Sequence, residues 1–102
     1  MLEGRARLIG PVRQEVLSGI RDPRQFERLK GHLRAFPDVP LDIEYFEYAA
    51  ELSNQCRAAG IASTGTDLLI CAVAINLRWQ ILTTDADFPR YRTRLPIRLF
   101  PE

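Results

Sequence analysis

Apolar residues fill positions 68–77 of the chain, with Asn76 as the polar interruption. A polar start signal at 64–66 precedes this run and Arg78 follows it, so the pattern predicts a helix that is buried on most of its faces. A short β-prone run then covers 80–84 and stops at the acidic tip 85–87. The segment therefore predicts one helix followed by one buried strand, with acidic residues at the two outer ends.

The lengths of these two elements predict where their acidic residues lie. A helix of about 12 residues spans roughly 18 Å, and a strand of about five residues spans roughly 17 Å. If the helix packs antiparallel to the strand, the helix N-terminus and the strand C-terminus meet at one edge of the sheet. Asp67 and Asp85 are then neighbours in space, at the edge where open parallel sheets bind ligands.

The N-terminal end of the chain predicts another acid at the same edge. Residues 6–10 are a short apolar strand candidate, and Pro11 suits the first turn of a helix that runs to about Ile20. Glu15 lies in this helix, within about one turn of the end of the strand. Glu15, Asp67 and Asp85 therefore form a predicted group of acids, and Asp87 follows two residues after Asp85.

The remaining segments alternate between helix and edge-strand patterns. One helix follows Pro23, and a longer helix covers 43–59 and ends at Gly60. The segments 37–42 and 96–100 are edge-strand candidates, whereas 88–94 is a loop or a short helix. This order predicts a single three-layer α/β domain. The predicted buried face of the longer helix consists of Phe46, Ala49, Ala50, Ser53 and Cys56.

Composition narrows the choice of partners only slightly. The net charge of +1 balances 14 basic against 13 acidic residues, so the overall charge does not mark a polyanion-binding protein. The cysteines lie in helical patterns without metal-ligand spacing, and no apolar run reaches the roughly 18 residues of a membrane span. We therefore expect reduced cysteines and a cytoplasmic protein without a signal peptide.

A group of carboxylates without basic partners usually holds a cation, because the like charges otherwise repel one another. Oxygen ligands without histidine or cysteine favour Mg²⁺ or Mn²⁺ over zinc. Such an ion lowers the pKa of a water nucleophile and neutralises charge on a phosphodiester. The predicted chemistry is therefore phosphoryl chemistry.

Each acid also has a plainer interpretation. Asp67 is the kind of first-turn acid that complements a helix dipole, in a turn that Thr64 would cap. Glu15 is a solvated helix residue in this interpretation, and Asp85 and Asp87 are ordinary turn formers. The arginines that crowd 90–98 are either a solvated face or contacts to phosphate.

Three segments resemble, in order and spacing, the second, third and fourth acidic motifs of PIN-domain ribonucleases, especially VapC-type toxins. They are QEVLSGI at 14–20, GTDLLICAVAI at 65–75 and ILTTDADF at 81–88. The resemblance covers nearly the whole chain. It implies that Glu15, Asp67 and Asp85 are catalytic carboxylates that bind Mg²⁺ or Mn²⁺, with Asp87 as an auxiliary metal ligand. It also implies a PIN-like fold with a short parallel sheet flanked by helices, an RNA substrate, a cognate antitoxin and a homodimer or larger assembly.

The sequence departs from this family at its beginning. PIN-domain toxins start with a buried strand that ends in Asp, and no counterpart precedes the strand candidate at 6–10. Relative to the family, the resemblance therefore implies a domain that is truncated at the N-terminus: either a truncated reading frame, or a short protein whose sheet is completed differently, for example by a second copy. We expect impaired RNA cleavage, because a metal ligand is lost, and an assembly that covers the resulting gap in the sheet.

Two other functions fit parts of the sequence. A non-catalytic PIN-like protein would keep the fold and bind an antitoxin or a second copy of itself. Metal binding that depends on Asp67 and Asp85 would distinguish the nuclease from this alternative. A phosphotransferase of the haloacid dehalogenase type is suggested by a strand that ends in Asp85, Ala86 and Asp87. Phe88 weakens this suggestion, since that family has a small residue there.

Overall fold

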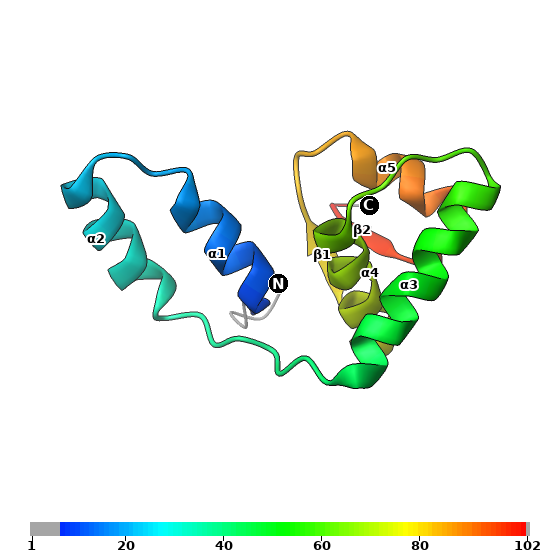
Figure 1. Cartoon of the computed structure of the whole chain (residues 1–102), viewed down its shortest axis with the longest axis horizontal. Helices are drawn as coiled ribbons and strands as arrows, with labels where there is room; N and C mark the ends of the chain where they lie inside the picture. The colour runs from blue at the N-terminus through cyan, green and yellow to red at the C-terminus, as the bar shows by residue number, and fades with distance from the viewer. Residues whose placement is uncertain (1–6, 102) are drawn as a thin grey trace. The chain divides into compact units, whose positions relative to one another are not determined.

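Four helices, a short strand, a fifth helix and a second short strand follow one another along residues 7–101, the part of the chain that the computed structural model describes. These residues divide into two compact units, one up to Pro40 and the other from Leu41 onward (Figure 1). Over the described residues, the first unit contains two helices and the second contains three helices and two strands. None of the helices in this part of the chain combines the length and the apolarity that crossing a membrane requires.

The first unit is built on helix α1 (Gly10–Ser18) and helix α2 (Pro23–Leu33), which contact each other. Part of the strand predicted at 6–10 lies outside the described residues. Within them, Leu8 makes an isolated parallel bridge to Asp38, and Gly10 already belongs to α1. The helix begins this early because Pro11, with its fixed φ, occupies its first turn.

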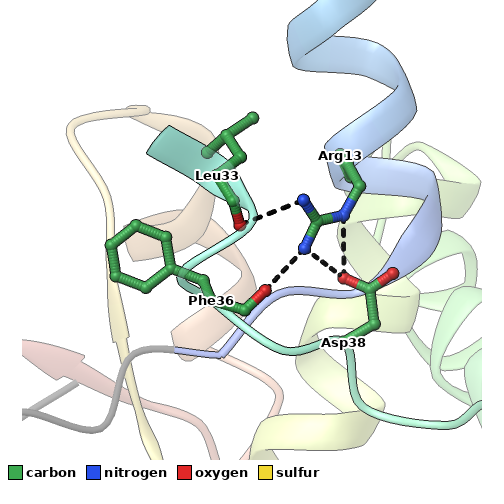
Figure 2. Close-up of polar contacts among 4 residues, drawn as sticks. All are labelled: Arg13, Leu33, Phe36 and Asp38. Atoms are coloured by element: carbon green, nitrogen blue, oxygen red, sulfur yellow. Dashed lines mark hydrogen bonds and ion pairs between the residues drawn. The ribbon is translucent and has the colours of Figure 1, made fainter. Parts of the chain in front are cut away.

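A single arginine connects the parts of the first unit (Figure 2). The guanidinium of Arg13 donates hydrogen bonds to the carbonyl oxygens of Leu33 at 3.1 Å and Phe36 at 2.6 Å. It also pairs with Asp38 Oδ1, at 3.0 Å from Nε and 2.9 Å from an Nη. The Leu33 carbonyl oxygen also accepts from the Phe36 amide at 2.9 Å, so Arg13 adds a second donor there and joins α1 to the chain that follows α2.

The second unit opens with helix α3 (Ile43–Ala58), which packs on helix α4 (Gly65–Leu77). Gly60 ends α3 as predicted, with a φ of 77°. Its amide donates to the Arg57 carbonyl oxygen at 3.0 Å, and the next amide, that of Ile61, donates to the Cys56 carbonyl oxygen at 2.8 Å. This pair of bonds is a Schellman motif, which requires a left-handed residue where Gly60 stands.

The buried face of α3 differs in part from the prediction. Ala49 and Cys56 are buried as expected, but the third buried residue is Leu52, and 51% of the Phe46 surface is exposed. Ala50 is also exposed, since one residue along a helix turns the side chain by about 100°. Spacings of three and four residues therefore describe the real face, onto which the mostly buried α4 packs.

The sheet consists of strand β1 (Gln80–Leu82) and strand β2 (Arg98–Phe100), paired in parallel with Ile81 opposite Leu99. Helix α5 (Asp87–Arg92) lies in the connection, as parallel strands need a crossover. Both strands were predicted, but each is shorter than its predicted range. The short parallel sheet flanked by helices confirms the predicted α/β class.

Candidate metal centre

Asp67 lies in the first turn of α4, where the sequence predicted it. The hydroxyl oxygen of Thr64, the N-cap residue, accepts a hydrogen bond from the Asp67 amide at 3.2 Å. The cap fixes the backbone of this turn and leaves the Asp67 carboxylate available for other partners. The predicted capping and the predicted clustering of Asp67 therefore coexist.

Asp85 and Asp87 lie in a turn that side chains of the turn itself hold. The Thr83 hydroxyl oxygen accepts from the Asp85 amide at 3.0 Å, and Asp85 Oδ1 accepts from the Asp87 amide at 2.9 Å. Such local bonds compete with strand pairing. They explain why β1 ends at Leu82, two residues before the predicted end, and why the chain turns directly into α5.

The three aspartates converge. One carboxylate oxygen from each of Asp67, Asp85 and Asp87 lies within 4.8 Å of the others. The predicted neighbourhood of Asp67 and Asp85 is thereby confirmed, and α4 contacts the strand that follows it, although that strand is shorter than the predicted length. Asp87 joins them from the start of α5.

The spacing and the chemistry of this cluster fit a hard divalent cation. Octahedral Mg²⁺ holds oxygen ligands at about 2.1 Å, so opposite ligand atoms are about 4.2 Å apart. The three oxygens lie within 4.8 Å of one another, so side-chain rotations would bring them onto one ion. Carboxylates without histidine or thiolate ligands match Mg²⁺ or Mn²⁺ rather than zinc.

Each aspartate has one oxygen bound by a protein donor. The Tyr91 hydroxyl donates to Asp67 Oδ2 at 2.7 Å, the Asp87 amide donates to Asp85 Oδ1 at 2.9 Å, and the Arg90 guanidinium pairs with Asp87 Oδ1. Among residues 7–101, no hydrogen bond reaches the second oxygen of any of the three carboxylates. The cluster therefore presents three oxygens without a protein donor.

The charge of Asp67 affects its buried neighbours. Burial raises the pKa of the Cys71 thiol to about 12, and the Asp67 and Cys56 side chains contribute further. Burial also raises the pKa of Tyr91, together with its hydrogen bond to Asp67. Both groups are therefore protonated at neutral pH, and Cys71 is the inert packing residue that the sequence predicted.

Glu15 lies in α1, in the first unit, and its side chain is exposed. Glu15 and the three aspartates belong to different units, and the structure within each unit does not give the distance between them. The role of Glu15 as a ligand therefore stays a prediction.

Tyr91 and Arg90 were not predicted as individual parts of the site. Arg90 was grouped with the arginines of 90–98, for which solvation or phosphate contact was expected. A helical reading of 88–94 would have placed Tyr91 on the same face as Asp87, four residues away. The sequence is compatible with either a loop or a short helix at 88–94, so the position of Tyr91 does not follow from it.

The comparison with known families agrees with the acidic motifs. A sequence model of the PIN domain matches residues 2–93, which include Glu15 and all three clustered aspartates. No curated protein matches the sequence.

Proposed function

Because this chain belongs to the PIN domain family, whose nuclease-type fold typically depends on a divalent metal, we propose that it is a metal-dependent ribonuclease of the VapC toxin type. The observation that carries the proposal is the convergence of Asp67, Asp85 and Asp87, with one oxygen of each within 4.8 Å of the others. The proposal implies RNA as the substrate and either Mg²⁺ or Mn²⁺ as the bound ion.

The three aspartates would hold the ion, with Glu15 as a further ligand. One oxygen from each aspartate would provide half of an octahedral shell, and each carboxylate keeps one oxygen that no donor among residues 7–101 reaches. Three protein oxygens suit Mg²⁺, because that ion keeps several waters. When bound, the ion lowers the pKa of a water nucleophile and neutralises charge on the phosphodiester.

Two arginines near the aspartates would position the RNA. Arg92 and Arg94 are exposed on and just after α5, the helix that begins at Asp87. Their guanidinium groups are suited to phosphate oxygens, and such contacts orient a nucleic acid without reading its sequence. We assign them to the RNA backbone, whereas Arg90 is engaged with Asp87.

Two partners complete the proposal. A cognate antitoxin would neutralise the nuclease, and a homodimer or larger assembly would cover the free edge of β1. Within the described residues β1 pairs only with β2, and 66% of the Leu82 surface is exposed. An unpaired strand edge is a template for pairing with another chain, and an exposed leucine beside it adds apolar surface to such a contact.

A second function is favoured by the existing partners of the acids. Arg90 pairs with Asp87 and Tyr91 donates to Asp67, so protein groups already compensate part of the negative charge. A non-catalytic PIN-like protein that binds an antitoxin or itself would need no more than this.

Cleavage of single-stranded RNA in Mn²⁺ separates the two functions. If the chain is a nuclease, we expect it to cleave the RNA, even if slowly. EDTA should stop this cleavage, and Asp67→Asn and Asp85→Asn should abolish it. The matched control is Asp42→Asn, which alters the exposed acid that caps α3. The absence of cleavage, together with the absence of Mn²⁺ binding that depends on Asp67 and Asp85, would replace the nuclease with the non-catalytic alternative.

A further inference from the structure

Tyr91 is the one side chain that reaches from α5 into the acidic cluster while being completely buried. Its exposed fraction is 0%, and its ring meets the Phe88 ring edge to face, with centroids 5.3 Å apart and planes at 78°. At its other end the hydroxyl donates to Asp67 Oδ2 at 2.7 Å. Packing therefore fixes the ring, and a charge-assisted hydrogen bond fixes the hydroxyl.

This hydrogen bond restricts the Asp67 carboxylate. The Asp67 backbone is held by the Thr64 cap, and one of its two carboxylate oxygens is held by Tyr91. A side chain bound at both ends has little freedom to rotate, so the second oxygen has a defined direction. Partners of this kind, behind the ligands, usually decide how well a metal site is organised.

Tyr91 also links two ligands that come from different helices. Asp87 is the first residue of α5 and Tyr91 follows four residues later on the same face. The Tyr91 hydroxyl contacts the first turn of α4, where Asp67 lies. The position of Asp67 relative to Asp87 therefore depends on this contact.

The tyrosine hydroxyl is the donor of this bond, because a carboxylate oxygen can only accept. A phenylalanine would fill the same space without the donor, which makes the role separable from packing.

We propose that Tyr91 is a positioning residue of the metal centre: its hydroxyl holds Asp67 so that the second carboxylate oxygen meets a divalent ion together with Asp85 and Asp87. The proposal rests on the proposed metal-dependent function. It goes beyond that function because it makes the affinity of the site for the ion depend on a residue that does not bind the ion itself. A purely structural tyrosine would instead affect stability alone.

The test compares Mn²⁺ affinity in the whole 102-residue chain by calorimetric titration. Tyr91→Phe is expected to bind Mn²⁺ at least about tenfold more weakly than the wild type. Tyr45→Phe is the matched control, because the Tyr45 hydroxyl oxygen accepts a hydrogen bond from Asn76 at 2.9 Å, at the opposite end of α4. This control is expected to bind Mn²⁺ as the wild type does.

The outcomes separate the two proposals. If the wild type binds Mn²⁺ and Tyr91→Phe binds it equally well or more tightly, the role of Tyr91 is overturned while the metal centre stands. If the wild type binds neither Mn²⁺ nor Mg²⁺, both proposals are overturned.

A second measurement needs no change at Tyr91. With ¹³C at the ζ carbon of the tyrosines, Mg²⁺ is expected to shift the Tyr91 resonance and to leave those of Tyr45 and Tyr48 in place. The resonances of the two latter residues are assigned with Tyr45→Phe and Tyr48→Phe. Saturating Mg²⁺ that shifts none of the three resonances would contradict the positioning role, whatever the folding of the Tyr91→Phe variant.

Discussion

Asp85→Asn is the cleanest perturbation of the metal centre. Asp85 is exposed, and its Oδ1 accepts the Asp87 amide in the turn before α5. Asparagine has the same shape and retains a side-chain oxygen for this bond, so the turn is preserved. The substitution therefore removes a charge and a metal ligand without removing the local structure.

The expected size of the effect follows from mass action. Mn²⁺ at about ten times its dissociation constant stabilises the folded state by about 1.4 kcal/mol. In a domain of this size that raises Tm by about 6–11 °C. The wild type should show this shift in a thermal melt followed by circular dichroism, and Asp85→Asn and Asp67→Asn should lose most of it.

Without metal, the effect of Asp85→Asn on Tm should have the opposite sign. Asp67 is held by Tyr91 and Asp87 by Arg90, so Asp85 is the clustered carboxylate without a side-chain donor among the described residues. Asp85→Asn relieves repulsion there, and its Tm without metal should equal or exceed that of the wild type. Asp42→Asn serves as the control with an unchanged Mn²⁺ shift. Equal Mn²⁺ shifts in the wild type, Asp67→Asn and Asp85→Asn would refute the site.

Three further expectations concern the neighbours of the site. Arg90→Gln should bind Mn²⁺ severalfold more tightly in a calorimetric titration, because Asp87 loses the guanidinium that competes with the ion; weaker binding would contradict this competition. Burial holds the Cys71 pKa near 12, above its ordinary 9.0, so the folded state retains a proton that the unfolded state loses, and stability should fall as pH rises from about 9 to 12. Thermal melts should show a shallower fall in Cys71→Ala, and identical slopes would contradict the assignment. Light scattering at micromolar concentration should report a dimer or larger assembly that Leu82→Lys weakens, whereas a well-folded wild-type monomer would show that β1 needs no partner.

The metal cluster could be predicted from the sequence because its main distance depends on local geometry. Asp67 and Asp85 flank one helix and the strand that follows it, and the contact between these two consecutive elements brings the two aspartates together. The cap at Thr64 and the turn at Asp85 are likewise encoded within three residues of their partners. Such features need no knowledge of tertiary packing.

The features that the sequence did not predict depend on longer contacts. Tyr91 reaches Asp67 across 24 residues, and the contact exists only because 87–92 is a helix rather than a loop. The early end of β1 at Leu82 results from competition between side-chain turns and strand pairing, which propensity alone does not resolve. Phe46 lies within an apolar pattern and yet is half exposed, since a pattern identifies a stripe but not how far the partner helix covers it.

The hydrogen bonds of Arg13 determine which changes of sequence the first unit can accept. Neither α1 nor α2 contains a buried residue, although Ile9 just before α1 is buried, so apolar packing within these two helices is limited. One planar cation, which donates to two carbonyls and pairs with one carboxylate, adds a polar connection between them. Lysine could not reproduce this fork of donors. We therefore expect homologous chains to tolerate many substitutions on the helix surfaces and changes of length at 19–22, while position 13 admits only arginine.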